Sequence, residues 1–192
     1  MKRQHHAIYV PGILDDKLRI QSTIVATWRL YGVHGHCHEI PWAGAEAWRP
    51  KFQRLLAEID KYHSQGHQVS LVGASAGASA VLNAYAERSD KINGLIYICA
   101  KINTPETVSQ KTYDENPAFK TSLELLQANL PKLKPQDKVK MLSLYSPADG
   151  TVPYAATVIP GVKESQLPRL KHGRAILYSL SFGASGLARF IK

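Results

Sequence analysis

Cysteine and long apolar runs are scarce in this chain of 192 residues. The two cysteines, Cys37 and Cys99, are too few for a disulfide scaffold, so we expect a reducing compartment and a cytoplasmic protein. No apolar run approaches the roughly 18 residues that cross a bilayer, and we expect no membrane span. The basic and then apolar N-terminus is interrupted by Pro11 and Gly12, which indicates a first strand rather than a secretion signal.

Acidic residues are also in deficit, because 15 Asp and Glu face 24 Lys and Arg and leave a net charge of +9. Such a surplus attracts anionic small-molecule substrates, membrane surfaces or nucleic acid. No nucleic-acid-binding motif accompanies the charge, so we interpret it as a solvated basic surface and expect no nucleic-acid partner. A basic nucleic-acid-binding protein remains an alternative.

Strand and helix patterns alternate along the chain, which predicts a single α/β domain over residues 1–192. We expect a three-layer α/β/α sandwich with a mainly parallel sheet of about six strands. The apolar segments that read as strands are 5–10, 34–42, 67–73, 92–100 and 139–146. The segments with helical spacing start near Asp16 and near Glu46, and cover 76–88 and 173–192.

The alternation lapses over residues 103–137, where only 121–130 reads as a clear helix. An insertion of this length between two core strands is typical of a short cap over a functional site. We therefore expect its apolar residues Tyr113, Phe119 and Leu125 to shape a substrate pocket.

The pentapeptide Gly73-Ala74-Ser75-Ala76-Gly77 follows a predicted strand and opens a predicted helix. A G-x-S-x-G sequence in this position is typical of a sharp turn that presents the serine in a strained backbone conformation. Small neighbours are needed because larger side chains would collide across the turn. Ser75 is thus the candidate nucleophile, and a tightly packed helix start is the purely structural alternative.

A serine nucleophile needs a base and an acid, which follow it along the chain in this type of site. His172 is the only histidine after Ser75, and Asp149 lies on a turn after a predicted late strand. Asp-Gly is also an ordinary turn signal, so the aspartate has a structural interpretation too. Asp114 and Asp137 are weaker candidates, since neither follows a strand.

Two backbone amides should stabilise the oxyanion that forms during attack. Ala76 supplies the first at the start of the helix. The loop after the first strand supplies the second, because Gly12 permits an unusual turn that can aim the Ile13 amide at the site.

With these residues the sequence resembles the α/β-hydrolase superfamily, in particular its compact serine hydrolases and esterases. The segments that carry the resemblance are "VPGIL", "GASAG", "SPADGTVP" and "KHG", although Pro11-Gly12 stands where many members have His-Gly. The resemblance implies a Ser75–Asp149–His172 triad that cleaves an ester, thioester or amide through an acyl-enzyme, without a cofactor. Gly12, Val152, Tyr113 and Phe119 are the substrate-binding residues that we expect.

We therefore predict a serine hydrolase, a monomer or homodimer, that acts on a small carboxylic ester or thioester. An anionic substrate would suit the basic charge. A catalytically silent binding protein with the same fold is the second alternative, because a fold does not prove an activity.

His34, His36 and His38 alternate in "HGHCHE" and would share one face of a strand. Such an arrangement could bind Zn²⁺ or Ni²⁺, but the spacing is not diagnostic of a zinc site. We expect a solvated edge strand and no metal.

Overall fold

The computed structural model describes residues 3–13 and 18–192, which form a parallel sheet in the order β2-β1-β3-β4-β5-β6. Its strands are β1 (His5–Val10), β2 (His34–Cys37), β3 (Gln68–Ala74), β4 (Ile92–Ile98), β5 (Met141–Tyr145) and β6 (Lys163–Gln166). All five neighbouring pairs are parallel, so the carboxyl ends of the strands meet at one edge of the sheet. The predicted three-layer α/β class and the strand number are confirmed.

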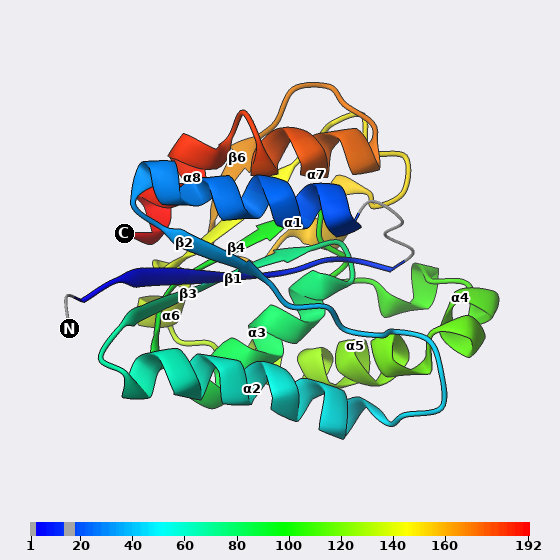
Figure 1. Cartoon of the computed structure of the whole chain (residues 1–192). Coiled ribbons are helices and arrows are strands. Elements are labelled where there is room, and N and C mark those ends of the chain that lie inside the picture. Colours follow the sequence, from blue (N-terminus) through cyan, green and yellow to red (C-terminus); the bar gives the residue numbers. More distant parts are fainter. Residues whose placement is uncertain (1–2, 14–17) are drawn as a thin grey trace.

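Helices cover both faces of the sheet (Figure 1). One layer contains α1 (Leu18–Ala26), α7 (His172–Leu180) and α8 (Ala184–Ile191), and the opposite layer contains α2 (Trp48–Ser64), α3 (Gly77–Arg88) and α5 (Pro117–Asn129). Each layer encloses its own apolar core against the sheet. The predicted apolar stripe of α2 is part of one core, in which Phe52, Leu55 and Ile59 are fully buried.

Two predicted segments differ from the structure in their extent, and a third cannot be compared with it. The second strand ends at Cys37 rather than at 42, although the His38 amide still donates to the Tyr9 carbonyl at 2.8 Å. The single helix expected over 173–192 is two helices, since the chain bends at Ser181 and resumes a helix at Ala184. The predicted start of the first helix at Asp16 lies outside the described residues.

The sixth strand, β6, was not identified from the sequence. Its residues Lys-Glu-Ser-Gln are polar and mostly exposed at the edge of the sheet, so they carry no alternating apolar signal. Only its parallel pairing with β5 defines it as a strand.

The insertion over 103–137 contains more helix than the one segment expected. Besides α5 it forms α4 (Gln110–Glu115), α6 (Pro135–Lys138), and the single turns η2 (Pro105–Thr107) and η3 (Leu130–Lys132). The remaining turns of this kind are η1 (Thr27–Tyr31) and η4 (Tyr154–Thr157). α5 packs on α2 and α3, while α4 lies beyond the carboxyl ends of the strands (Figure 1).

Within the described part of the chain, we find no helix with the length and apolar character that crossing a bilayer requires.

Candidate active site

Ser75 lies on a sharp turn between β3 and α3, and its φ of 51° is in the left-handed region. The strained backbone expected from the pentapeptide is therefore present. A Cβ added at Gly73 would meet the Ala78 Cα at 2.7 Å, and one at Gly77 would meet the Val10 carbonyl oxygen at 2.1 Å. Only glycine fits at these two positions, because the chain crosses itself and the end of β1 there.

The end of β1 also contacts the serine itself. A Cβ added at Gly12 would lie 2.8 Å from the Ser75 Cβ and 3.3 Å from its hydroxyl oxygen. The loop that carries Gly12 and Ile13 thus runs directly against Ser75. The Ser75 amide donates to the Ile98 carbonyl at 3.0 Å, which fixes the turn to the neighbouring strand.

Asp149 and His172 are joined by a hydrogen bond of 2.7 Å between Oδ2 and Nδ1. The other carboxylate oxygen accepts from the amides of Thr151 and Val152, both at 2.9 Å. Burial by itself raises the pKa of Asp149, but the bonds from His172 and from the two amides outweigh burial and hold the pKa below its usual value. The carboxylate is therefore ionised at neutral pH and orients the imidazole.

The thiol of Cys99 lies beside this pair. Ligand atoms of Cys99, Asp149 and His172 lie within 4.8 Å of one another, the only such trio in the described residues with donors suited to a metal. Burial raises the pKa of the Cys99 thiol, and the nearby Asp149 carboxylate raises it further. A protonated thiol is a poor metal ligand, so we interpret the trio as an acid–base pair with a neutral neighbour.

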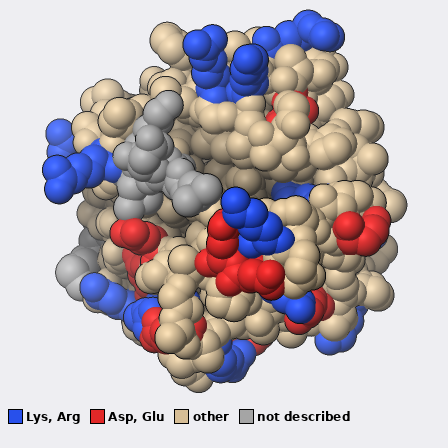
Figure 2. Space-filling view, turned by 90° about the vertical axis from the view of Figure 1, so that its right-hand side faces the viewer, with Lys and Arg blue, Asp and Glu red and all other residues tan. Residues whose placement is uncertain are grey.

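A cavity of about 420 Å³ connects the predicted residues, and both Ser75 and His172 line it. Ala76, Ile13, Val152 and Phe119 are also in its wall. The cavity opens at the carboxyl ends of the strands, and a hollow is visible at the centre of that side of the molecule (Figure 2). In an open parallel sheet this edge is where ligands bind.

Other predicted residues lie away from this cavity. Tyr113 is not in the cavity wall: its ring centre lies 6.1 Å from that of Phe119, and its hydroxyl donates to the Pro105 carbonyl. Leu125 lines a separate surface pocket. Neither residue is therefore placed as the sequence predicted.

The two weaker acid candidates are occupied elsewhere. Asp114 accepts a hydrogen bond from Gln110 within α4. Asp137 accepts from the hydroxyl of Tyr85 and from the amide of Lys134. Of the three aspartates considered, only Asp149 contacts the histidine.

Sequence reasoning missed the polar wall of the cavity, which comes from the segment after β4. Its members are Lys101, Thr107, Ser109 and Thr112. A lysine only three residues beyond a buried strand that ends at the ligand-binding edge was a usable signal, because lysine is rarely buried without a reason.

Away from the cavity, the rings of His6, His34, His36 and His67 form a cluster near the start of β1. His36 on β2 lies 2.8 Å from His6 between ring nitrogens, and His38 lies 2.6 Å from the Glu58 carboxylate of α2. His34 is exposed on the edge strand, as expected, but His36 and His38 are partly buried. The expectation of a solvated strand therefore holds for His34 but not for His36 and His38.

No family model matches the chain, and no curated protein matches it in sequence. Solved structures do match it over almost its full length. Est1E from Butyrivibrio proteoclasticus is 15% identical with a TM-score of 0.67, and the match covers 100% of this chain and 88% of Est1E.

Two further solved structures give similar values. The esterase domain of a Rhodothermus marinus protein is 15% identical with a TM-score of 0.68, and the match covers 98% of this chain and 87% of that one. A Paleococcus ferrophilus monoacylglycerol lipase is 12% identical with a TM-score of 0.67, and the match covers 98% of this chain and 95% of the lipase. The chain has the α/β-hydrolase fold, which confirms the fold that the sequence motifs indicated.

Proposed function

We propose that this protein is a serine hydrolase that cleaves a carboxylic ester or thioester through an acyl-enzyme on Ser75. The observation that carries the proposal is the 2.7 Å hydrogen bond between Asp149 and His172, at a cavity that both His172 and the strained Ser75 line. A hydrogen-bonded carboxylate–imidazole pair and a strained serine at one cavity are the parts that a serine nucleophile requires.

His172 acts as the base in this proposal. Its Nδ1 is bound to Asp149, so Nε2 is the nitrogen available to take the proton of the serine hydroxyl. The ionised carboxylate stabilises the imidazolium that forms during attack. The same imidazolium then returns the proton to the leaving alcohol or thiol, and water hydrolyses the acyl-enzyme by the reverse sequence.

The oxyanion is held by the amides of Ala76 and Ile13. Both residues line the cavity on either side of the serine, and Gly12 brings the loop of Ile13 into contact with Ser75. Donors fixed in the backbone need no rearrangement as charge develops, which is why such a pair lowers the barrier by about 3 kcal/mol or more per donor.

The apolar wall selects the acyl group in this proposal. Phe119 from α5, Val108 and Val152 contribute apolar surface next to the serine. A cavity of about 420 Å³ accepts a small molecule rather than a long polymer segment. The insertion over 103–137 supplies Phe119 and Val108 to this wall, which supports its proposed role as a cap.

A fluorophosphonate probe tests the proposal, since it labels only a serine that is activated as a nucleophile. We expect the wild-type protein to be labelled and to release 4-nitrophenol from short 4-nitrophenyl esters. Ser75→Ala should abolish both signals. The control Ser89→Ala, directly after the carboxyl end of α3, should retain both. An unlabelled and inactive wild-type protein would instead support the silent binding protein.

A further inference from the structure

Lys101 is a buried cation in the wall of the candidate active site. It follows β4 closely, only 7% of it is exposed, and it lines the same cavity as Ser75 and His172. Lysine is almost never buried to this extent unless its charge is paired. In the described residues, however, no carboxylate lies within ion-pair distance of its ammonium group.

The hydrogen bonds of Lys101 leave part of the ammonium unused. Its Nζ donates to the hydroxyls of Thr104 and Thr107. Each hydroxyl gives its own proton to a backbone carbonyl, Thr104 to Asn103 at 2.7 Å and Thr107 to Thr104 at 3.0 Å. Both hydroxyls therefore act as neutral acceptors, and the third proton of an ammonium has no partner within this set.

The backbone around Lys101 is strained in a way that supports a binding role. Thr104 has φ 56° and ψ 54°, a left-handed conformation that β-branched residues rarely adopt. The turn brings the hydroxyls of Thr104 and Thr107 onto the same ammonium. Strain of this kind is retained mainly at ligand clamps and active sites.

The surroundings of the ammonium favour an anion as the missing partner. Burial lowers the pKa of Lys101, and the attraction of the exposed Glu106 carboxylate offsets this only in part. The hydroxyls of Ser109 and Thr112 also line the cavity and share a hydrogen bond of 2.8 Å, so the one that accepts in this bond can donate its own proton to an anionic oxygen. An anion placed there would pair with the buried charge and complete its hydrogen bonds.

We infer that Lys101 selects substrates that carry an anionic group, a carboxylate or phosphate, in addition to the ester that Ser75 cleaves. The inference rests on the proposed function and adds the substrate class to it. The apolar residues of the cavity would bind the apolar part of the substrate, and Lys101 would bind its anionic group.

Paired substrates test the inference. The 4-nitrophenyl monoesters of adipate and suberate carry a free carboxylate, and their methyl-capped counterparts are neutral and almost equal in size. The carboxylate can also be placed on the leaving group, in 3-carboxyphenyl acetate and its methyl-capped form. We expect a wild-type preference for the charged member of at least one pair of about tenfold in kcat/KM, the effect of one charge-assisted hydrogen bond.

Lys101→Met removes the charge and keeps the length of the side chain. We expect this variant to lose the preference, so that the ratio of kcat/KM on the preferred anionic ester to kcat/KM on its neutral partner falls about tenfold. Lys101→Gln keeps a polar group for the two threonine hydroxyls, which guards against a folding defect. Lys140→Met is the matched control. It removes the charge of an exposed lysine directly before β5, at the end of the strand remote from the cavity, and should leave the preference unchanged.

The outcomes separate the two proposals. If wild type cleaves neutral esters and Ser75→Ala does not, the serine hydrolase stands. If wild type also cleaves the charged and neutral member of each pair at equal rates, the role of Lys101 is overturned. If no ester is cleaved, calorimetry with monomethyl adipate and with inorganic phosphate decides. Binding of either one that weakens in Lys101→Met supports the anion site, and no binding or equal binding overturns it.

Discussion

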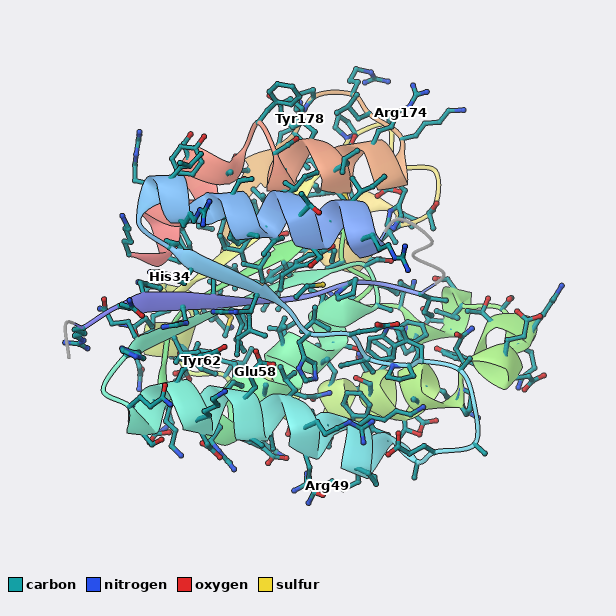
Figure 3. The ribbon with its side chains drawn as sticks, in the orientation of Figure 1. His34, Arg49, Glu58, Tyr62, Arg174 and Tyr178 are labelled. Atoms are coloured by element: carbon teal, nitrogen blue, oxygen red, sulfur yellow. The ribbon has the colours of Figure 1, made fainter. Side chains whose placement is uncertain are left out.

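Acidification should destabilise this protein through His6, which lies at the start of β1 in the cluster of histidines. Its side chain is enclosed, with the residue only 6% exposed, and its Nε2 is buried without a hydrogen-bond partner. Tyr62 of α2 stacks on it with 4.2 Å between ring centres, and its Nδ1 lies 2.8 Å from His36 Nε2. Tyr62 and Glu58 both extend from α2 toward the sheet, on the side where His34 lies on β2 (Figure 3).

Burial lowers the pKa of His6 to about 4, and repulsion from His36, His67, His34 and His5 contributes. The pKa of His36 is lowered as well, because burial outweighs the attraction of Glu58, and His34 and Lys61 repel an added positive charge. A protonated His6 would thus be buried among potential cations. The folded protein therefore holds this ring neutral down to about pH 4.

The sign of the effect follows from comparing the folded and unfolded states. The unfolded chain binds a proton at His6 below a pKa of about 6.5, while the folded chain does so only below about 4. Folding is therefore disfavoured progressively as the pH falls through this window, and the loss is complete near the folded value. The difference between the two pKa values corresponds to about 3 kcal/mol.

Urea unfolding at about pH 7.5 and about pH 4.5 measures this loss, with His6→Phe as the test variant. Phenylalanine keeps the stacking on Tyr62 but cannot titrate, so the variant should lose about 2 to 3 kcal/mol less than wild type over this interval. His63→Gln, which removes an exposed histidine from the end of α2, should behave like wild type. Equal pH dependence in wild type and His6→Phe would refute the reasoning.

Three further outcomes follow from contacts at the turn and the acid. Gly77→Ala should lower the free energy of unfolding, measured by urea unfolding, by about 3 kcal/mol or more, because its Cβ would meet the Val10 carbonyl oxygen at 2.1 Å. The control is Gly186→Ala in α8, which should not be destabilising because no atom lies within 4 Å of the added Cβ. Gly12→Ala should leave the fold intact but reduce ester hydrolysis at least about tenfold, because its Cβ would press on Ser75. Asp149→Asn should reduce kcat about 10⁴-fold in a stopped ester assay, because the imidazole loses its orienting acceptor.

The turn at Ser75 was predictable because its cause is local. The steric demand of the turn falls on Gly73 and Gly77, which lie within two residues of the serine, and both demands are visible in the sequence. The pairing of Asp149 with His172 was predictable for a different reason. Chain order and the position of each residue at the carboxyl edge of a parallel sheet left few alternatives.

Features that depend on distant contacts were not predictable. β6 is a strand only because its polar residues pair with β5 at an open edge. The break after α7 follows from packing: the Trp28 indole donates to the Leu180 carbonyl at 2.8 Å, and a Cβ at Gly183 would meet the Ser179 carbonyl at 2.6 Å. Helical periodicity continues through both segments, so the sequence alone favoured one helix.

Tyr113 is not part of the cavity wall, although the sequence favoured it as a pocket residue. Its aromatic ring lies 6.1 Å from that of Phe119, and threonine and serine hydroxyls line the cavity in this part of the chain. Composition does not distinguish a residue that faces a cavity from one that packs behind it.

Backbone strain gives independent support to the location of the site. Among residues 3–13 and 18–192, only Ser75, Cys99 and Thr104 are non-glycine residues with positive φ. Ser75 follows β3, and Cys99 and Thr104 follow β4 within a few residues, so all three lie beyond the carboxyl ends of these strands. A left-handed conformation costs such residues roughly 1 to 2 kcal/mol each, which packing elsewhere must offset. Cys99 and Thr104 flank Lys101, so the strain that presents Ser75 and the strain that brings the lysine into the wall belong to adjacent strands of one site.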